Sequence, residues 1–356
     1  MKWINDVVFA ILAAHVWGSL MLFVWLQAVK RLEDKGYTRL LFYLLRAVIV
    51  AYLLPLGLGA VLIINEILVL DGRFMQTTPV ITMICQLLFI LWILGFFANF
   101  ESLQEKWDIT RHCFSDALPA SRERQLRFQE ICRQTKMRSG RVILCEKAGI
   151  RCGGITVGVI HPRIVLPEGK TDEFVERVTM IHELVHYTRK DIWFLTAAKV
   201  VEAIHWFNPW TRGLAAQMSQ WNEYACDWKV CNKYLGNIKE YLEVLYRVSM
   251  QGQEDKTDMY SSIGTQPMKL IGRMEKMINM KNAMKKPKIF GVLAAVAVSF
   301  TSAGSALAST GILAGGYRAL YELTDVEEDE VGIKSVGDID LLTGNTTPQD
   351  NSNINP

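Results

Sequence analysis

The sequence predicts a mainly α-helical membrane protein with four transmembrane helices and an α+β domain between the third and the fourth of them. Three observations lead to this fold class. Four stretches of 22 to 28 residues carry at most one charged side chain each. Lysine and arginine are distributed unevenly between the segments that join these stretches. The longest joining segment combines short runs rich in β-branched residues with longer runs of helical periodicity.

The four hydrophobic stretches cover residues 7–29, 40–64, 79–100 and 289–316. Each is long enough to cross a bilayer as a helix, which takes about 20 residues. No small-residue cleavage site follows the first stretch, so a retained span is favoured over a signal peptide. The fourth contains alanines at signal-peptidase spacing, but its internal position favours an intact span. Arg46 lies near one end of the second stretch, where we expect its side chain to extend toward the lipid headgroups.

The orientation follows from the charges of the joining segments. Residues 101–288 hold 30 Lys and Arg against 22 Asp and Glu, whereas residues 317–356 hold nine acidic and two basic side chains. Because positive segments face the cytoplasm, we expect residues 101–288 inside the cell and both the N-terminus and the acidic tail outside. The tail is also rich in Asn, Thr and Pro, which predicts disorder.

The composition narrows the functional class. Residues 101–288 carry a net positive charge but no nucleic-acid-binding signature. Membrane insertion and contact with anionic lipid explain this charge, so direct nucleic-acid binding is not expected. Seven cysteines are present, none in a Cys-x-x-Cys pair, and six lie in the segment expected in the cytoplasm. Because thiols stay reduced there, we interpret them as buried small hydrophobes and not as a disulfide framework.

Within the cytoplasmic segment the periodicity predicts helices and strands in a definite order. Residues 101–137 have the polar pattern of one long helix, and β-branched runs predict one strand in "RVILCE" and two in "GITVGVIHPRIVLP". A strong helix follows, with Thr171 as its expected N-cap. The remaining runs predict helices at about 192–207, 211–235 and 237–280. The first of these is expected to lie along the membrane or to pack on the bundle.

The strong helix carries "HELVH", residues 182–186. His182 and His186 are one helical turn apart, so both imidazoles project from the same face and can bind one Zn²⁺. Glu183 lies beside them, where its carboxylate can accept a proton from a water whose pKa the metal lowers to about 7. This spacing is typical of zinc proteases but also arises by chance. The alternative is a polar helix face with two solvent-facing histidines.

A catalytic zinc needs a third protein ligand. The segment "NEYACD" offers Glu223 and Asp227, which lie four residues apart and share one face of a separate helix. Glu223 is the candidate ligand, and Asp227 is the candidate to hydrogen-bond a ligand histidine and hold its tautomer. A charged pair on a solvated helix face is the alternative.

"HELVH", "HWFNP" and "NEYACD" in this order, with three predicted spans before them and one after, resemble the BlaR/MecR antirepressor family of membrane zinc metallopeptidases. The resemblance covers residues 1–316. It implies a bacterial cell-membrane protein with a gluzincin-type fold. It also implies one zinc ion per chain, held by His182, His186 and Glu223, with Glu183 as the catalytic base.

Two further roles follow from the resemblance. An extended substrate pairs with an edge strand in related zinc proteases, and the residues that match this strand are Ile155, Val157 and Val159. His205 in the His-Trp-Phe-Asn-Pro segment is a candidate to stabilise an oxyanion, with a membrane-interface histidine as the alternative. One feature departs from the family. Members that sense β-lactams carry an extracellular Ser-x-x-Lys nucleophile, and residues 317–356 contain no such motif, so direct acylation is not expected.

The sequence therefore predicts a zinc endopeptidase that cuts a protein on the cytoplasmic side of the membrane during signal transduction. A BlaI-like transcriptional repressor, the chain itself, or both are the expected substrates. One alternative is an HtpX-like protease of membrane-protein quality control, and another is a non-catalytic signalling scaffold that keeps zinc for stability. The lipid bilayer and the protein substrate are the expected partners, and homodimer formation stays open.

Overall fold

The computed structural model describes residues 2–33, 35–54, 79–150, 153–169, 171–251, 261–262 and 267–283, together with isolated positions between 304 and 323. This part of the chain is mainly helical and includes a small sheet. Its helices are α1 (Lys2–Leu32), α2 (Thr38–Leu53), α4 (Pro79–Cys113), α5 (Arg122–Thr135), α6 (Glu173–Thr188), α7 (Asp191–Ile204), α8 (Leu214–Lys229), the π-helix η2 (Val230–Leu235), α9 (Ile238–Gln251) and α10 (Pro267–Ala283).

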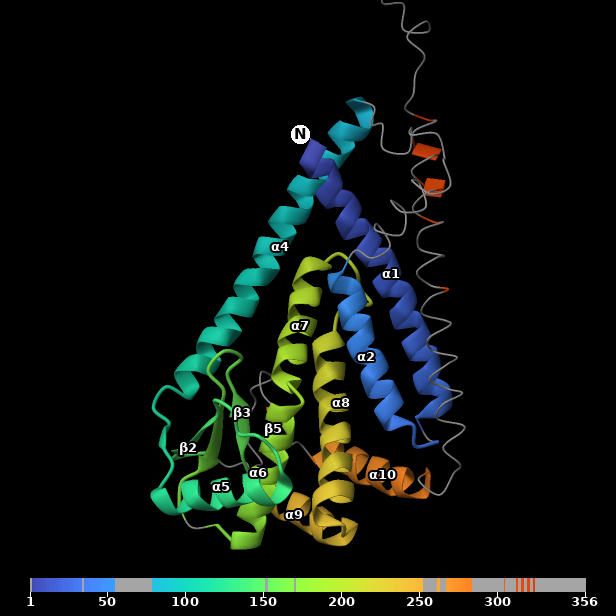
Figure 1. Cartoon of the computed structure of the whole chain (residues 1–356). Helices are drawn as coiled ribbons and strands as arrows, with labels where there is room; N and C mark the ends of the chain where they lie inside the picture. Colours follow the sequence, from blue (N-terminus) through green and yellow to red (C-terminus); the bar gives the residue numbers. More distant parts are fainter. Residues whose placement is uncertain are drawn as a thin grey trace, which may run out of the picture.

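Among the described residues, α1 and α4 are the two helices that are long and apolar enough to cross a membrane. They contain the first and third predicted spans, and they converge near the N-terminus and diverge toward the sheet (Figure 1). Leu91 and Leu94 on α4 are exposed by 61% and 64%, as expected of an apolar surface that contacts lipid. α2 contains the first part of the second predicted span. The rest of that span and, apart from isolated positions, the fourth predicted span (residues 289–316) lie outside the described residues.

The hairpin of α7 and α8 lies between α4 on one side and α1 and α2 on the other (Figure 1). Trp92 on α4 donates from Nε1 to the carbonyl at the end of α7 at 2.9 Å. In the turn, Asn208 donates to the hydroxyls of Ser19 on α1 and Tyr52 on α2, both at 3.2 Å. The prediction that this segment packs on the bundle is confirmed. Its turn reaches the middle of the first and third predicted spans.

The sheet has five strands in the order β1-β2-β4-β3-β5. β2 and β4 are parallel, and the other neighbouring pairs are antiparallel. The three predicted strands are confirmed as β2, β4 and β3, whereas the two short outer strands were not predicted. The strands are β1 (Leu118–Pro119), β2 (Ile143–Lys147), β3 (Ile155–Val157), β4 (Arg163–Pro167) and β5 (Ser261–Ser262).

Two of the predicted long helices are interrupted. Residues 101–137 do not form one helix, because α4 continues from the third predicted span to Cys113 and β1 then separates it from α5. Pro119 cannot donate a helical hydrogen bond, and the Ser121 hydroxyl accepts one from the backbone of Arg124 to begin α5. α4 has no break at residue 100, where the sequence predicted the end of the third span. The predicted helix over residues 237–280 is likewise interrupted, by β5.

The N-cap of α6 lies one residue later than predicted. Asp172, and not Thr171, is the N-cap: its carboxylate accepts from the backbone N–H groups of Phe174 and Val175 at 2.9 and 3.1 Å. A charged cap at this end also interacts favourably with the helix dipole. The helix that carries residues 182–186 is therefore capped at its start.

Two hydrophobic cores meet at α8. One core packs α1, α2 and α7 against the first part of α8 and includes Trp221 and Tyr224. The other packs α5, α6, α9 and the sheet against the end of α8 and includes Cys226 and Val230. Residues 223–227 therefore lie where the core of α1, α2 and α7 meets the core that contains the sheet.

Candidate metal centre

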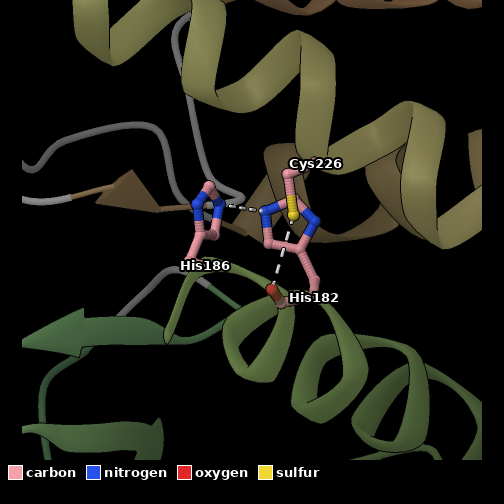
Figure 2. Close-up of side chains that lie close together, drawn as sticks. All are labelled: His182, His186 and Cys226. Carbon is pink, nitrogen blue, oxygen red and sulfur yellow. Dashed lines mark hydrogen bonds between the residues drawn. The ribbon is translucent and has the colours of Figure 1, made fainter. Parts of the chain in front are cut away.

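α6 places the three residues of its motif in the protein interior. His182, Glu183 and His186 are each 0% exposed, because this face of α6 packs against β3, β4 and α8. As their spacing requires, the two imidazoles share one face, and their Nε2 atoms lie 2.9 Å apart (Figure 2). The alternative of two solvent-facing histidines is therefore wrong.

α8 brings Glu223 to the same point. Its carboxylate oxygens lie 3.5 Å from Nε2 of His182 and 3.4 Å from Nε2 of His186. Glu223 is 5% exposed and Asp227 is 0% exposed, so this pair does not form a solvated helix face. The packing of α6, α7 and α8 thus unites residues that are far apart in the sequence.

The geometry of this cluster fits a single divalent metal ion. Two tetrahedral ligands, each about 2.0–2.1 Å from zinc, are separated by about 3.3 Å. The corresponding separations among His182, His186 and Glu223 are 2.9, 3.5 and 3.4 Å. Two imidazoles and one carboxylate also leave a fourth coordination position open, as catalytic sites do. The donor set is therefore suited to a catalytic metal.

Hydrogen bonds at Nδ1 orient both imidazoles. Nδ1 of His186 lies 2.7 Å from a carboxylate oxygen of Asp191, so Nδ1 carries the proton and Nε2 stays available for a metal. Nδ1 of His182 lies 2.8 Å from the hydroxyl of Tyr241, which donates to Asp227 at 2.7 Å. The sequence predicted a direct bond from Asp227 to a ligand histidine. The structure places Tyr241 between them, with a direct separation of 3.8 Å.

A buried arginine on α10 completes this network. Arg273 is 2% exposed and donates to the two carboxylate oxygens of Asp227 at 2.8 and 2.6 Å. It also lies 3.2 Å from Glu223. Burial alone would raise the pKa of Glu223, but Arg273 and the histidines outweigh burial and hold this pKa well below its usual range. Glu223 is therefore ionised, as a metal ligand must be.

Arg46 reaches the centre from α2, the helix that contains the first part of the second predicted span. Its guanidinium donates to Asp191, the residue that orients His186. The side chain is 11% exposed and stacks on Phe42 and Phe194, with its Cζ 4.3 and 4.1 Å from their ring centroids. The expectation that Arg46 extends toward the headgroups is wrong, because a buried carboxylate beside α2 offers it a partner.

Glu183 is arranged differently from the other acids. Thr156 on β3 donates from its hydroxyl to Oε2 of Glu183 at 2.7 Å. Oε1 is buried and has no hydrogen-bond partner among the described residues. Burial raises the pKa of Glu183 above its usual value. One oxygen is thus fixed in place and the other is free to accept a proton.

Cys226 was not predicted as a site residue, yet its sulfur lies beside both histidines (Figure 2). The thiol contacts the main-chain oxygen of His182 at 3.4 Å. Its position is one helical turn along α8 from Glu223, so both side chains face the same point. Cys226 is therefore the competing candidate for the third ligand.

A cavity of about 440 Å³ opens beside His186. The end of β3 and residues 158–160 form one wall, and residues 186–193 form the other. Trp193 in this wall is 54% exposed. The cavity therefore borders the candidate metal centre at His186, whereas His182, Glu183 and Glu223 do not line it.

The sequence predicted an edge strand at Ile155, Val157 and Val159 that would pair with a substrate, and the structure shows where these residues lie. Ile155 is paired with Ser262 of β5, so β3 is not a free edge there. Val157 is the last residue of β3, and Val159 lies beyond the strand in the wall of the cavity. The chain's own β5 lies on the edge that was expected to bind a substrate.

The structure does not bring His205 to this cluster. His205 follows the last residue of α7, about 20 Å along the helix axis from Asp191. It is 0% exposed, its Nε2 lies 3.1 Å from the carbonyl oxygen of Tyr52, and its ring packs near His15. This placement supports neither the oxyanion role nor a membrane-interface role. His205 instead fixes the α7–α8 turn to α1 and α2.

Comparison with known proteins identifies the family. The profile of a family described as BlaR1 peptidase M56 matches residues 72–278, more than half of the chain. A curated relative, the regulatory protein BlaR1 of Bacillus licheniformis, is 37% identical over 83 residues. That match covers 21% of this chain and only 13% of the relative's length. The chain belongs to the BlaR1 peptidase M56 family of membrane-associated metallopeptidases.

Proposed function

We propose that the chain is a zinc-dependent endopeptidase that hydrolyses peptide bonds on the cytoplasmic side of a bacterial cell membrane, in signal transduction. One observation carries the proposal. His182, His186 and Glu223 converge at the separations expected of metal ligands, and the adjacent Glu183 has a carboxylate oxygen, Oε1, without a hydrogen-bond partner among the described residues. The charge distribution along the chain supports the orientation, with the N-terminus and the acidic tail outside.

Each residue would have a distinct task. His182, His186 and Glu223 would hold the zinc ion. Bound zinc would supply Lewis acidity, which polarises a peptide carbonyl and makes water a stronger nucleophile near neutral pH. Glu183 would accept the proton of the attacking water at Oε1 and pass it to the leaving amine. Asp191, Tyr241 and Asp227 would keep the two imidazoles in the tautomer that binds metal.

A BlaI-like transcriptional repressor is the proposed substrate, and the chain itself is a second one. Support for the first comes from the family and from the relative's name as a regulatory protein. Support for the second comes from β5, since Ser261 pairs with Thr156, whose hydroxyl contacts Glu183. This antiparallel pairing with β3 is the arrangement that a bound substrate strand would adopt.

Incubation of the full chain in lipid nanodiscs with a purified BlaI-like repressor tests the proposal. We expect the repressor to be cut into defined fragments, the cutting to stop with a zinc chelator, and added zinc to restore it. If the zinc-loaded chain leaves the repressor intact but degrades unfolded membrane proteins, the quality-control alternative is correct. If neither protein is cut, the scaffold alternative is correct.

We expect Arg46→Met to weaken zinc binding by about 10–100-fold, the range seen when groups that orient metal ligands are lost. Without the guanidinium, Asp191 loses its cation and holds His186 less firmly. Competition with a chromogenic zinc chelator measures the change, and exposed Arg31→Met on α1 is the control. Because Arg46 acts through Asp191, adding Arg46→Met to an Asp191→Asn chain should lower zinc affinity little further. If the double variant instead loses the sum of the two single losses in binding free energy, Arg46 does not act through Asp191.

Arg273→Met is expected to lower both zinc affinity and thermal stability. The change leaves Asp227 and Glu223 buried without their cation, and breaking a buried ion pair costs about 3–5 kcal/mol. Arg273→Lys should recover part of both losses. Lys276→Met, on the same helix but paired with Glu33 at 2.9 Å, is the control. If Arg273→Met binds zinc as tightly as Lys276→Met does, Arg273 does not contribute to zinc binding.

A further inference from the structure

The cavity beside His186 is lined by three basic side chains, Arg138, Arg141 and Lys190. All three are exposed, and among the described residues no carboxylate forms an ion pair with any of them. Asp191 is the one acidic residue in the lining, and it is engaged in holding His186. The cavity therefore carries a net positive charge next to the candidate metal centre.

The backbone keeps these charges beside the centre. Lys190 joins α6 to α7 in the left-handed conformation, with φ 58°. The backbone N–H of Arg141 donates to the hydroxyl of Tyr187, the residue that follows His186, at 3.3 Å. The neighbouring Gly140 permits this approach, since a Cβ there would lie 2.3 Å from the same hydroxyl. The basic loop is thus fixed against the helix that carries the metal-binding motif.

The direction of an extended chain in the site follows from β5. β5 runs antiparallel to β3, with Ser261 opposite Thr156. The hydroxyl of Thr156 contacts Glu183, so a bond to be cut would lie near the residue opposite Thr156. In this direction, the N-terminal part of a bound peptide runs toward residues 158–160 and the basic cavity. Val159 and Ile160, which line the cavity, lie three and four positions beyond Thr156, so we expect peptide residues three to four positions before the cut to reach it.

We infer, on the basis of the proposed function, that this cavity binds an acidic side chain of the substrate, Asp or Glu, on the N-terminal side of the bond that is cut. Arg138, Arg141 and Lys190 recognise the carboxylate. Several exposed ion pairs acting together favour an acidic over a basic residue by about tenfold in kcat/KM. The preference weakens as salt rises, since exposed charges are screened over about 8–10 Å at 0.10–0.15 M ionic strength.

Anionic lipid headgroups are the other ligands that such cations bind. Peptide is favoured here because the same cavity is lined by His186 and Thr156, next to the metal centre and its base. The cations therefore surround the place where a peptide would be cut. Nanodiscs of neutral phosphatidylcholine, compared with discs containing phosphatidylglycerol, separate the two ligands.

The experiment uses the zinc-loaded full chain in phosphatidylcholine nanodiscs and a library of random decapeptides whose cut sites are read by mass spectrometry. Asp and Glu should be enriched about tenfold over Lys and Arg at positions three to four residues before the cut. The double variant Arg138→Glu/Arg141→Glu should reverse the enrichment. Arg122→Glu/Lys239→Glu, which reverses two exposed charges away from the cavity, is the matched control. Arg141→Gln is the milder variant, with an expected partial loss.

The outcomes separate this inference from the proposed function. The inference is overturned if the cut sites show no acidic enrichment, or if the cavity variants leave the enrichment unchanged. The proposed peptidase function would still stand in either case. If the cavity variants leave the cut sites unchanged but abolish a preference of the chain for phosphatidylglycerol, the cations bind lipid and the inference is also overturned. If no peptide is cut, the proposed function fails. The inference is then tested by measuring peptide binding to the chain. The Glu183→Gln chain should bind a Glu-containing peptide about tenfold more tightly than its Lys-containing counterpart. Equal binding overturns the inference.

Discussion

Glu183→Gln is expected to reduce peptide cleavage by at least about 100-fold while the metal stays bound. General bases contribute about 10²–10⁴-fold to enzymatic rates. Glutamine retains the size of the side chain and a contact with Thr156, but it cannot accept a proton at the position of the buried, unpartnered Oε1. The measurements are kcat for repressor cleavage and zinc content by mass spectrometry, both on the full chain in nanodiscs.

Glu173→Gln is the matched control for this substitution. Glu173 lies on the same helix but is exposed in its first turn, so its replacement should leave both cleavage and zinc content unchanged. If Glu183→Gln cleaves as fast as the unmodified chain, Glu183 is not the base. If it loses its zinc, Glu183 has a structural role at the metal that the present geometry does not assign to it.

The second large effect is expected at the third ligand. Glu223→Gln should lower zinc affinity by more than the 10–100-fold typical of groups that only orient ligands, because it removes a charged donor from the metal itself. Zinc recovered with the purified chain should then fall from about one ion to below about 0.2 per chain. Equilibrium dialysis against a zinc buffer provides the affinity.

Cys226→Ser distinguishes the two candidates for the third position. The serine hydroxyl can replace the contact of the thiol with the main-chain oxygen of His182, so the fold should be retained. If Glu223 is the ligand, this variant keeps its zinc and its activity. Loss of zinc in Cys226→Ser together with retention in Glu223→Gln would make Cys226 the ligand, and the gluzincin assignment would be wrong.

The candidate metal-binding residues could be proposed from the sequence because their pattern is local. In both "HELVH" and "NEYACD", side chains four residues apart share a helix face whatever the tertiary fold. Helix periodicity alone could not show that the two faces meet, and the resemblance to a known family supplied that step. Cys226 lies inside the second motif, but without the packing its thiol could not be distinguished from any other buried cysteine.

The residues that orient the candidate metal-binding side chains were missed because they depend on tertiary contacts. Asp191, Tyr241 and Arg273 lie on three different helices, and nothing in their local sequence points toward the metal centre. One signal was available. Arg46 lies within a hydrophobic stretch, and a charge in such a stretch usually has a specific partner or a function. Sequence reasoning placed it at the headgroups because the alternative partner was 145 residues away.

The errors in the strand and helix predictions have a similar origin. β5 comprises only Ser261 and Ser262, which have no apolar alternation of their own, and it forms a strand because β3 offers it a partner. Pairing of this kind is long-range and leaves no local signature. By contrast, the break at Pro119 was visible in the sequence, and the polar helical pattern on both sides concealed it.

The turn between α7 and α8 has a practical consequence. Asn208 and its neighbours present irregular backbone at the depth of Ser19 and Trp92, and such backbone is tolerated within a bilayer only where protein covers it. α4 packs tightly against this turn, since a Cβ on Gly95 would lie 2.1 Å from the Trp206 ring. A water-soluble fragment that starts near residue 101 would lose this cover along with Arg46, so purification and inhibitor screening require the intact chain in detergent or lipid.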